Sequence, residues 1–190
     1  MKIKTILLML CWVLFSTTAV ATETAKPRVH MQTTLGPIVI ELDPQAAPKT
    51  VENFLQYARS GFYTQTIFHR VIKGFMIQGG GLTPDMQKKK TSADIENEAD
   101  NGLKNVRGSI AMARTMNPHS ATAQFFINTV NNRNLDFTSK TTQGWGYCVF
   151  GRVVQGLETV DKIENTATTV KAGRRDVPAV PVIIESVSVE

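Results

Sequence analysis

One stretch of the chain combines an arginine and a glutamine with aromatic and β-branched neighbours and closes on three glycines. It is FHRVIKGFMIQGGG at residues 68–81, and its composition predicts a strand broken once by the first glycine. Residues of equal parity share a strand face, so Arg70, Met76 and Gln78 are expected to point together, and Phe75 joins them if that glycine introduces a bulge. Such a face carries a permanent cation, an amide, a thioether and a phenyl ring. Its chemistry would be hydrogen-bond donation beside an apolar surface.

Recognisable arrangements for covalent or metal chemistry are missing from the sequence. The three histidines, His30, His69 and His119, are dispersed and lack the spacing of metal ligands. There is no Gly-x-Ser-x-Gly elbow, and no cysteine is poised beside a histidine. His69 falls on the strand face opposite Arg70 and is expected to be structural. We therefore expect no nucleophile, no metal and no other cofactor.

A second strand, expected at residues 124–130, also mixes polar and aromatic side chains. Gln124, Phe126 and Asn128 share one face of it, while Phe125 and Ile127 share the other. The polar flanks predict that Phe126 faces outward with Gln124 and that the other two enter the core. An exposed phenylalanine beside an amide is typical of a pocket floor, with a scattered surface aromatic as the alternative.

Hydrophobic periodicity predicts the elements that must position these strands. In chain order they are strands at 28–34, 37–42, 109–114, 147–154 and 182–189 and amphipathic helices at 48–61 and 156–163. Polar residues 82–101 are expected to form a loop whose three consecutive lysines are solvated. Seven or so strands, two helices and no repeat favour a closed antiparallel barrel capped by helices. Spacing alone leaves a sandwich open.

The two strands resemble the signature motifs of the cyclophilins, which are peptidyl-prolyl cis-trans isomerases. Residues 68–81 resemble the active-site strand of that family, and residues 111–114 (AMAR) with 123–128 (AQFFIN) resemble its second signature. The likeness continues through residues 146–151 and covers roughly residues 28–190. It implies one isomerase domain over 28–190, folded as an eight-stranded antiparallel barrel closed by two helices.

The resemblance also implies how an arginine could catalyse without a nucleophile. Rotation about an X-Pro bond is opposed by a barrier of about 18 to 20 kcal/mol. At the twisted transition state the prolyl nitrogen gains a lone pair that can accept a hydrogen bond, and the planar ground state offers none. Arg70 is the expected catalytic donor because its guanidinium stays charged and rigid.

The family motifs place further side chains around the substrate. They imply an apolar wall, amides that hold the peptide, and main-chain groups that pair with it: Phe75, Met76, Gln78, Ala113, Arg114, Gln124, Phe126, Asn134, Leu135 and Tyr147. Two of these depart from the better-known eukaryotic pattern. Asn134 replaces a common tryptophan and Tyr147 a common histidine, so cyclosporin binding is expected to be weak. Residues 115–123 are one residue longer than in that pattern, as in exported bacterial cyclophilins.

The N-terminal segment has the form of a secretory signal. Lys2 and Lys4 precede an apolar run at residues 6–15, and Ala19-Val20-Ala21 is a small-x-small cleavage site. The run is too short to span a bilayer. We expect a signal peptide over residues 1–21, cleavage after Ala21, a short leader over 22–27, a periplasmic location and no membrane attachment afterwards. Once the signal peptide is removed, Cys148 is the lone cysteine, and it is expected to be a buried core thiol.

Several functional alternatives remain from the sequence. The expected partners are proline-containing peptides and folding exported proteins, and nothing demands more than a monomer. The formal charge of +5 is too small and dispersed to indicate nucleic acid binding. A proline-peptide binding module or chaperone could use the same groove with little catalysis. A hydrolase would require a nucleophile in an unrecognised arrangement.

Overall fold

Alternating burial builds the first hairpin of the protein. In the computed structural model, which describes residues 25–190, every second residue of β1 (Arg28–Thr33) is buried. Strand β2 (Gly36–Leu42) pairs with it antiparallel across the predicted turn. The Thr33 hydroxyl fixes this turn, because it accepts from Leu35 N at 3.2 Å and donates to Gly36 O at 2.7 Å. The expected signal peptide lies outside the described residues.

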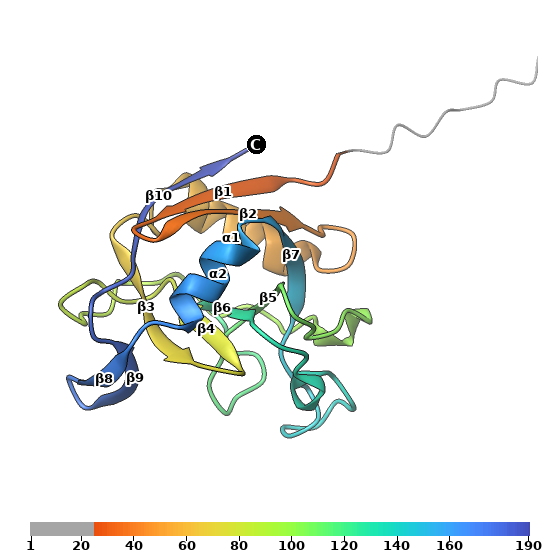
Figure 1. Cartoon of the computed structure of the whole chain (residues 1–190). Coiled ribbons are helices and arrows are strands. Elements are labelled where there is room, and N and C mark those ends of the chain that lie inside the picture. The colour runs from red at the N-terminus through yellow and green to blue at the C-terminus, as the bar shows by residue number, and fades with distance from the viewer. Residues whose placement is uncertain (1–24) are drawn as a thin grey trace, which may run out of the picture.

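Eight strands close into an antiparallel barrel, which confirms the predicted fold (Figure 1). The hydrogen-bonded order around the barrel is β1-β10-β3-β4-β6-β5-β7-β2. The strands not yet given are β3 (Thr66–Ile72), β4 (Met76–Gly79), β5 (Ser109–Met112), β6 (Phe125–Asn128), β7 (Val149–Gln155) and β10 (Ile183–Val189). The 3₁₀ turns η1 (Ala99–Asn101) and η2 (Arg133–Leu135) lie in the connecting loops.

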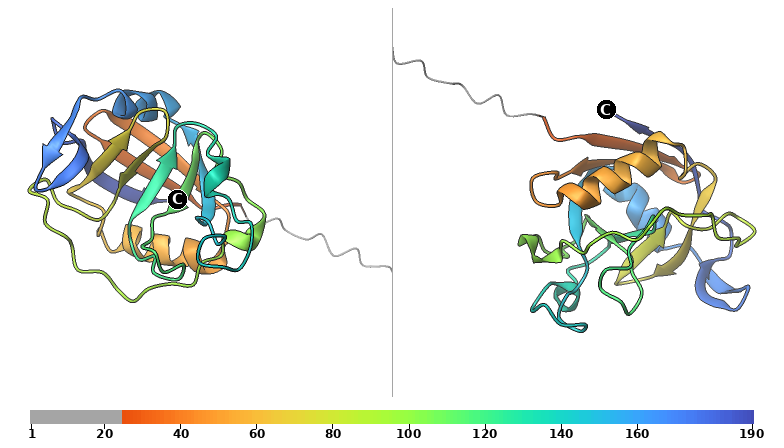
Figure 2. Two further views of the ribbon diagram at one scale, coloured as in Figure 1. Left: turned by 90° about the horizontal axis from the view of Figure 1, so that it is seen from below. Right: turned by 180° about the vertical axis from the view of Figure 1, so that it is seen from behind.

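The two helices lie on opposite sides of the barrel and contribute to its core (Figure 2, left). Helix α1 (Pro48–Arg59) begins at the predicted proline and buries the face predicted from its periodicity. On that face the Phe54 ring packs at a tilt against Phe150, with 5.1 Å between ring centres, and meets Phe125 edge-on at 5.6 Å. Helix α2 (Leu157–Glu164) buries Val160 and Ile163 in the same cluster. None of the described helices is long and apolar enough to cross a membrane.

The stretch at residues 68–81 is a hairpin and not the single strand expected. Gly74 has φ +71° and sits in the turn between β3 and β4, where Phe75 N donates to Ile72 O at 3.1 Å. The pairing sets Arg70 opposite Gln78, with a register shift between Phe68 and Arg70. A turn glycine in the left-handed region therefore ends one strand and starts the next.

The structure differs from the sequence prediction at one additional hairpin and at the lysine run. Strands β8 (Thr168–Lys171) and β9 (Arg174–Pro178) form a separate hairpin, and every residue of β8 is exposed. The lysine run is only partly solvated, because the Lys89 ammonium donates to the carbonyls of Phe62 and Thr64 and lies 4.8 Å from the Phe62 ring. This lysine fastens the long loop after β4 to the chain that follows α1.

Candidate active site

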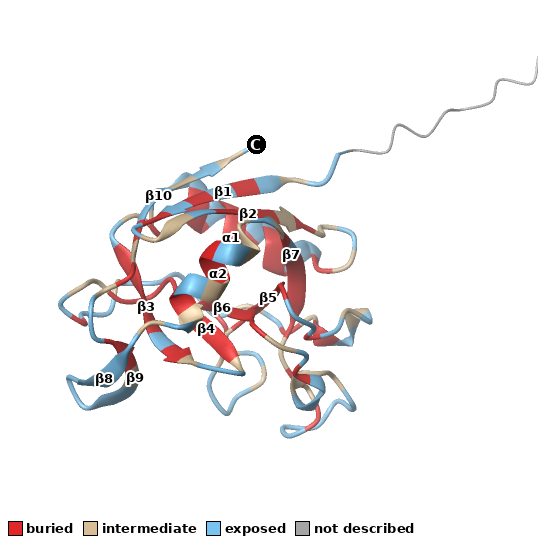
Figure 3. Cartoon of the chain, viewed as in Figure 1, coloured by how far each residue is buried: buried red, intermediate tan, exposed pale blue. Residues whose placement is uncertain are grey.

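One row of side chains crosses the outer face of the barrel. The strand registers place Arg70 opposite Gln78, Gln78 opposite Phe126, and Phe126 opposite Ala111. Directly opposed residues share a face, so these four lie together on the outside. On each of these strands, a residue adjacent in sequence to the member of the row is buried in the main core: Val71, Ile77, Ile127 and Ile110. The strands in this region are mostly buried (Figure 3).

The row borders a small cavity of about 100 Å³, lined by both polar and apolar side chains. Its lining consists of Arg70, Phe75, Met76, Gln78, Ala113, Arg114, Phe126, Leu135 and Tyr147. Segments far apart in the chain therefore bring nine of the residues proposed from sequence to one place. Met76 and Phe126 form a separate buried cluster with Ala111 and Val149, against which Phe75 also packs.

Arg70 is exposed on β3, on the face that borders the cavity. Gln78 lies directly across on β4, and its Nε2 donates to Gln124 Oε1 at 3.1 Å. Gly81 makes room for this amide pair, because a Cβ at Gly81 would lie 2.4 Å from the Gln124 side chain. Gln124 therefore does not line the cavity itself, and its side-chain amide orients that of Gln78.

The far wall of the cavity is aromatic and cationic. The Arg114 guanidinium lies 4.7 Å from the centre of the Tyr147 ring, and its Nε donates to Gly146 O at 2.8 Å. Tyr147 meets Phe126 edge-on at 5.5 Å. Phe126 faces out of the barrel as expected, but it is only 4% exposed and not the exposed residue predicted, because these neighbours cover it.

Three asparagines occupy places that the sequence did not reveal. Asn134 is exposed on η2 and lies outside the lining of this cavity, although the next residue, Leu135, lines it. Asn105 and Asn132, which were not singled out, are buried behind the cavity and hydrogen-bond to its lining segments. Asn132 belongs to a cluster of asparagines after β6, and Asn105 lies in the irregular segment before β5; neither position distinguishes a buried amide from a loop residue in sequence.

The two buried titratable side chains near this region are inert at neutral pH. His69 precedes Arg70, and burial, followed by the nearby Arg174, lowers its pKa to about 4. Cys148 lies in the core as expected, and burial raises the pKa of its thiol to about 12. A neutral imidazole and a protonated thiol leave Arg70 and Arg114 as the charged groups among the lining residues.

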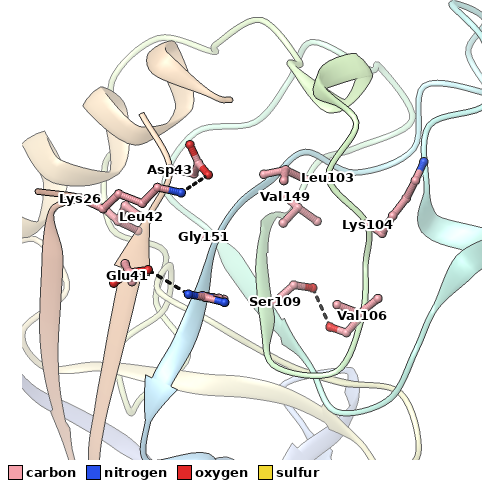
Figure 4. A pocket seen from close by; sticks show the side chains of 11 residues that line it. Lys26, Glu41, Leu42, Asp43, Leu103, Lys104, Val106, Ser109, Val149 and Gly151 are labelled. Atoms are coloured by element: carbon pink, nitrogen blue, oxygen red, sulfur yellow. Dashed lines mark hydrogen bonds and ion pairs between the residues drawn. The ribbon is translucent and has the colours of Figure 1, made fainter. Parts of the chain in front are cut away.

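A larger cavity, of about 190 Å³, lies elsewhere on the barrel (Figure 4). Leu42, Leu103 and Val149 are among its apolar lining. Two ion pairs lie at its edge, because Lys26 bonds Asp43 at 2.6 Å and Arg152 bonds Glu41 at 3.2 Å, and the exposed Lys104 also lines it. None of the residues proposed from sequence lines it. The family motifs therefore gather at the smaller cavity and not at this one.

The family model for cyclophilin type peptidyl-prolyl cis-trans isomerase/CLD matches residues 28–189. The chain therefore belongs to the cyclophilin family and is a cyclophilin-type peptidyl-prolyl cis-trans isomerase. It is 60% identical over 161 residues to the peptidyl-prolyl cis-trans isomerase cyp18 of Streptomyces antibioticus, which covers 85% of this chain and 97% of that protein. It is 59% identical over 161 residues to the peptidyl-prolyl cis-trans isomerase B of Escherichia coli K12, covering 85% and 98%.

The fold is also found among solved structures. A crystal structure of a cyclophilin type peptidyl-prolyl cis-trans isomerase from Cryptosporidium parvum superposes with a TM-score of 0.70 at 29% sequence identity. The likeness covers 87% of this chain and 97% of that chain. A second structure of the Cryptosporidium protein was obtained in the presence of the dipeptide Ala-Pro.

Proposed function

We propose that Arg70 is the catalytic residue of this isomerase and that the neighbouring cavity holds the proline ring. One observation carries the proposal: the strand registers set a permanent cation beside an amide and beside a cavity with apolar side chains in its wall, all on the same outer face. Within residues 25–190, no ion pair engages the Arg70 guanidinium. Its donors are therefore free for a substrate.

The chemistry follows from differential binding of the transition state. The guanidinium donates to the prolyl nitrogen only when that nitrogen becomes pyramidal, so the bond lowers the barrier without stabilising the planar amide. Such a charge-assisted bond contributes about 1.5 to 3 kcal/mol, whereas a ten-thousandfold acceleration needs about 5.5 kcal/mol. The remainder has to come from a pocket that fixes the ring while the preceding carbonyl rotates. Phe75, Met76, Phe126 and Leu135 provide that apolar enclosure, and Gln78 holds the substrate carbonyl.

Arginine variants test the proposal directly. The cis-to-trans rate of a short X-Pro peptide is measured with the mature protein, Arg70→Lys and Arg70→Ala, while peptide binding is followed by NMR. Arg152→Ala is the matched control, since Arg152 is an exposed arginine on β7 outside the pocket. We expect both Arg70 variants to lose most of the acceleration and to keep peptide binding. If instead they isomerise as fast as the control, Arg70 is not the catalytic donor.

The same experiment separates the enzyme from its main rival. A proline-peptide binding module or chaperone would bind the peptide with little change in its rotation rate. A protein of that kind would lose affinity, and not rate, when a pocket residue such as Phe126 is replaced. Cleavage of the peptide during the incubation would reveal a hydrolase.

We also propose that the protein is exported and acts on folding proteins of the periplasm as a monomer. The tripartite segment over residues 1–21 supports export. N-terminal sequencing of the protein from a periplasmic extract should begin at Thr22, and light scattering should give the monomer mass. Retention of Met1 in a cytoplasmic fraction would contradict the export proposal.

A further inference from the structure

Three buried asparagines form a hydrogen-bonded cluster behind the cavity. Asn105, Asn128 and Asn132 are 1%, 0% and 5% exposed. Asn132 Nδ2 donates to Asn128 Oδ1 at 2.7 Å, and Asn128 Nδ2 donates to Asn105 Oδ1 at 3.1 Å and to Ser109 Oγ at 2.9 Å. Buried amides are costly unless they are bonded, so each member depends on the others.

The two ends of the cluster bond the backbone of the pocket walls. Asn132 Nδ2 also donates to Phe75 O at 2.8 Å. At the other end, Asn105 Nδ2 donates to Leu135 O at 3.1 Å and to Tyr147 O at 3.3 Å. Phe75, Leu135 and Tyr147 all line the cavity.

The two walls come from segments next to strands that are not neighbours in the barrel. Phe75 belongs to the turn between β3 and β4, whereas Tyr147 leads into β7, and β6 and β5 lie between them in the barrel order. Backbone bonds reinforce the connection, because Asn132 N donates to Asn105 O at 2.7 Å and Leu135 N donates to Asn132 O at 2.9 Å. The cluster therefore ties one wall of the cavity to the other through side chains that do not line it.

We propose that Asn105 and Asn132 are positioning residues that set the width of the pocket and so its selectivity for a five-membered ring. The inference rests on the proposed role of the cavity as the proline site. A rigid apolar pocket discriminates one added methylene by about 10- to 200-fold, but only if its walls do not move apart. Without the cluster, the wall at Phe75 and the wall at Leu135 and Tyr147 can separate and admit a larger ring.

Selectivity between two ring sizes distinguishes a positioning role from a purely structural one, because a loss of folded protein does not change that selectivity. The specificity constant kcat/KM is measured for two peptides that differ only in carrying proline or its six-membered homologue, pipecolic acid. Loss of folded protein lowers both rates by the same factor, whereas a wider pocket changes their ratio. We expect Asn105→Ala and Asn132→Ala to lower the proline value about 10- to 100-fold, as expected for one or two lost hydrogen bonds, and to lower the pipecolyl value less.

Two further variants sharpen the test. Asn101→Ala is the matched control, since Asn101 bonds Val149 O at 2.9 Å and Leu103 N at 3.0 Å, and neither of these partners lines the pocket. It should leave the pipecolyl-to-proline ratio unchanged. Asn105→Ser keeps a small polar side chain that is too short to reach Leu135 O and Tyr147 O, so it should raise the ratio as Asn105→Ala does, and it replaces that variant if alanine prevents folding.

The outcomes separate the positioning role from the proposed catalytic site. A lowered proline rate with an unchanged ratio in the Asn105 and Asn132 variants would overturn the inference, as would an equal change of ratio in Asn101→Ala. If the wild type binds both peptides without accelerating either, the proposed function fails, and the ratio of their dissociation constants from NMR titration carries the same test.

Discussion

Acid is expected to destabilise this domain through His69, the residue before Arg70. Its side chain is 4% exposed, and Nδ1 has no hydrogen-bond partner within the described part of the chain. Burial, with the charges of Arg174 and Arg70, lowers the pKa of the ring from 6.5 to about 4. The folded state thus disfavours the protonated ring, so the free energy of unfolding is unaffected above pH 6.5 and falls as pH drops from 6.5 to 4. The loss is about 2 kcal/mol at pH 5 and about 3 kcal/mol at pH 4.

Urea denaturation at pH 7 and pH 5 measures this contribution. The wild type is compared with His69→Gln, which cannot take up a proton, and with His30→Gln, which removes an exposed histidine on β1. No carboxylate of the described residues bonds His69, so the carboxylates titrate alike in the wild type and His69→Gln, and the difference between these two proteins isolates the imidazole. His30→Gln alters only the titration of the exposed Glu190, which pairs with His30 at 2.9 Å. We expect His69→Gln to lose about 2 kcal/mol less than the wild type between the two pH values. His30→Gln should behave like the wild type.

A clear result would refute the reasoning. If His69→Gln loses as much stability as the wild type between pH 7 and pH 5, the imidazole is not held neutral by burial. A parallel loss in the two histidine variants would place the effect elsewhere. Since His69 lies at the register shift beside Arg70, the same protonation should lower isomerase activity before global unfolding.

Four further outcomes concern a buried thiol, two glycines and the exposed residue that precedes Leu135. Folded protein at pH 8 should resist thiol alkylation, because burial holds the pKa of Cys148 at about 12, and rapid labelling detected by mass spectrometry would contradict this. Gly80→Ala should lower urea stability by more than about 3 kcal/mol, since its Cβ would lie 2.5 Å from the Phe125 ring at φ +78°. Gly74→Ala, at φ +71° with open space around it, should cost only about 1 kcal/mol. Asn134→Trp should strengthen cyclosporin binding in a calorimetric titration without changing turnover, and unchanged weak binding would refute that assignment.

The elements with one buried face could be predicted from the sequence. Helix α1 and strand β1 each expose one side, so their periods of 3.6 and 2 remain visible. Strand β8 could not be predicted because all of its residues are exposed and no alternation exists. The turn at Gly74 was misread because a β-rich composition continues through both arms of the hairpin.

The candidate site was only partly predictable, for a related reason. The sequence prediction treated Arg70, Met76 and Gln78 as residues of one strand that share a face. In the structure Arg70 lies on β3 and reaches the same face as Gln78 because the two are paired across the hairpin. The sequence motifs indicated which side chains gather, but the amide cluster could not be foreseen. Asn105 and Asn132 lie in irregular segments, and only the tertiary fold brings them to the backbone of the pocket walls.

The position of the cavity explains why its strands lack a visible period. The barrel interior is filled by large side chains, including Phe54, Phe68, Phe125 and Phe150, so a peptide has to bind on the outside. An outer face that holds an apolar ring must itself be apolar and covered by loops, and every residue of β5 and β6 is accordingly buried. Loss of alternation in consecutive antiparallel strands is therefore a consequence of placing a binding surface on the outside of a packed barrel.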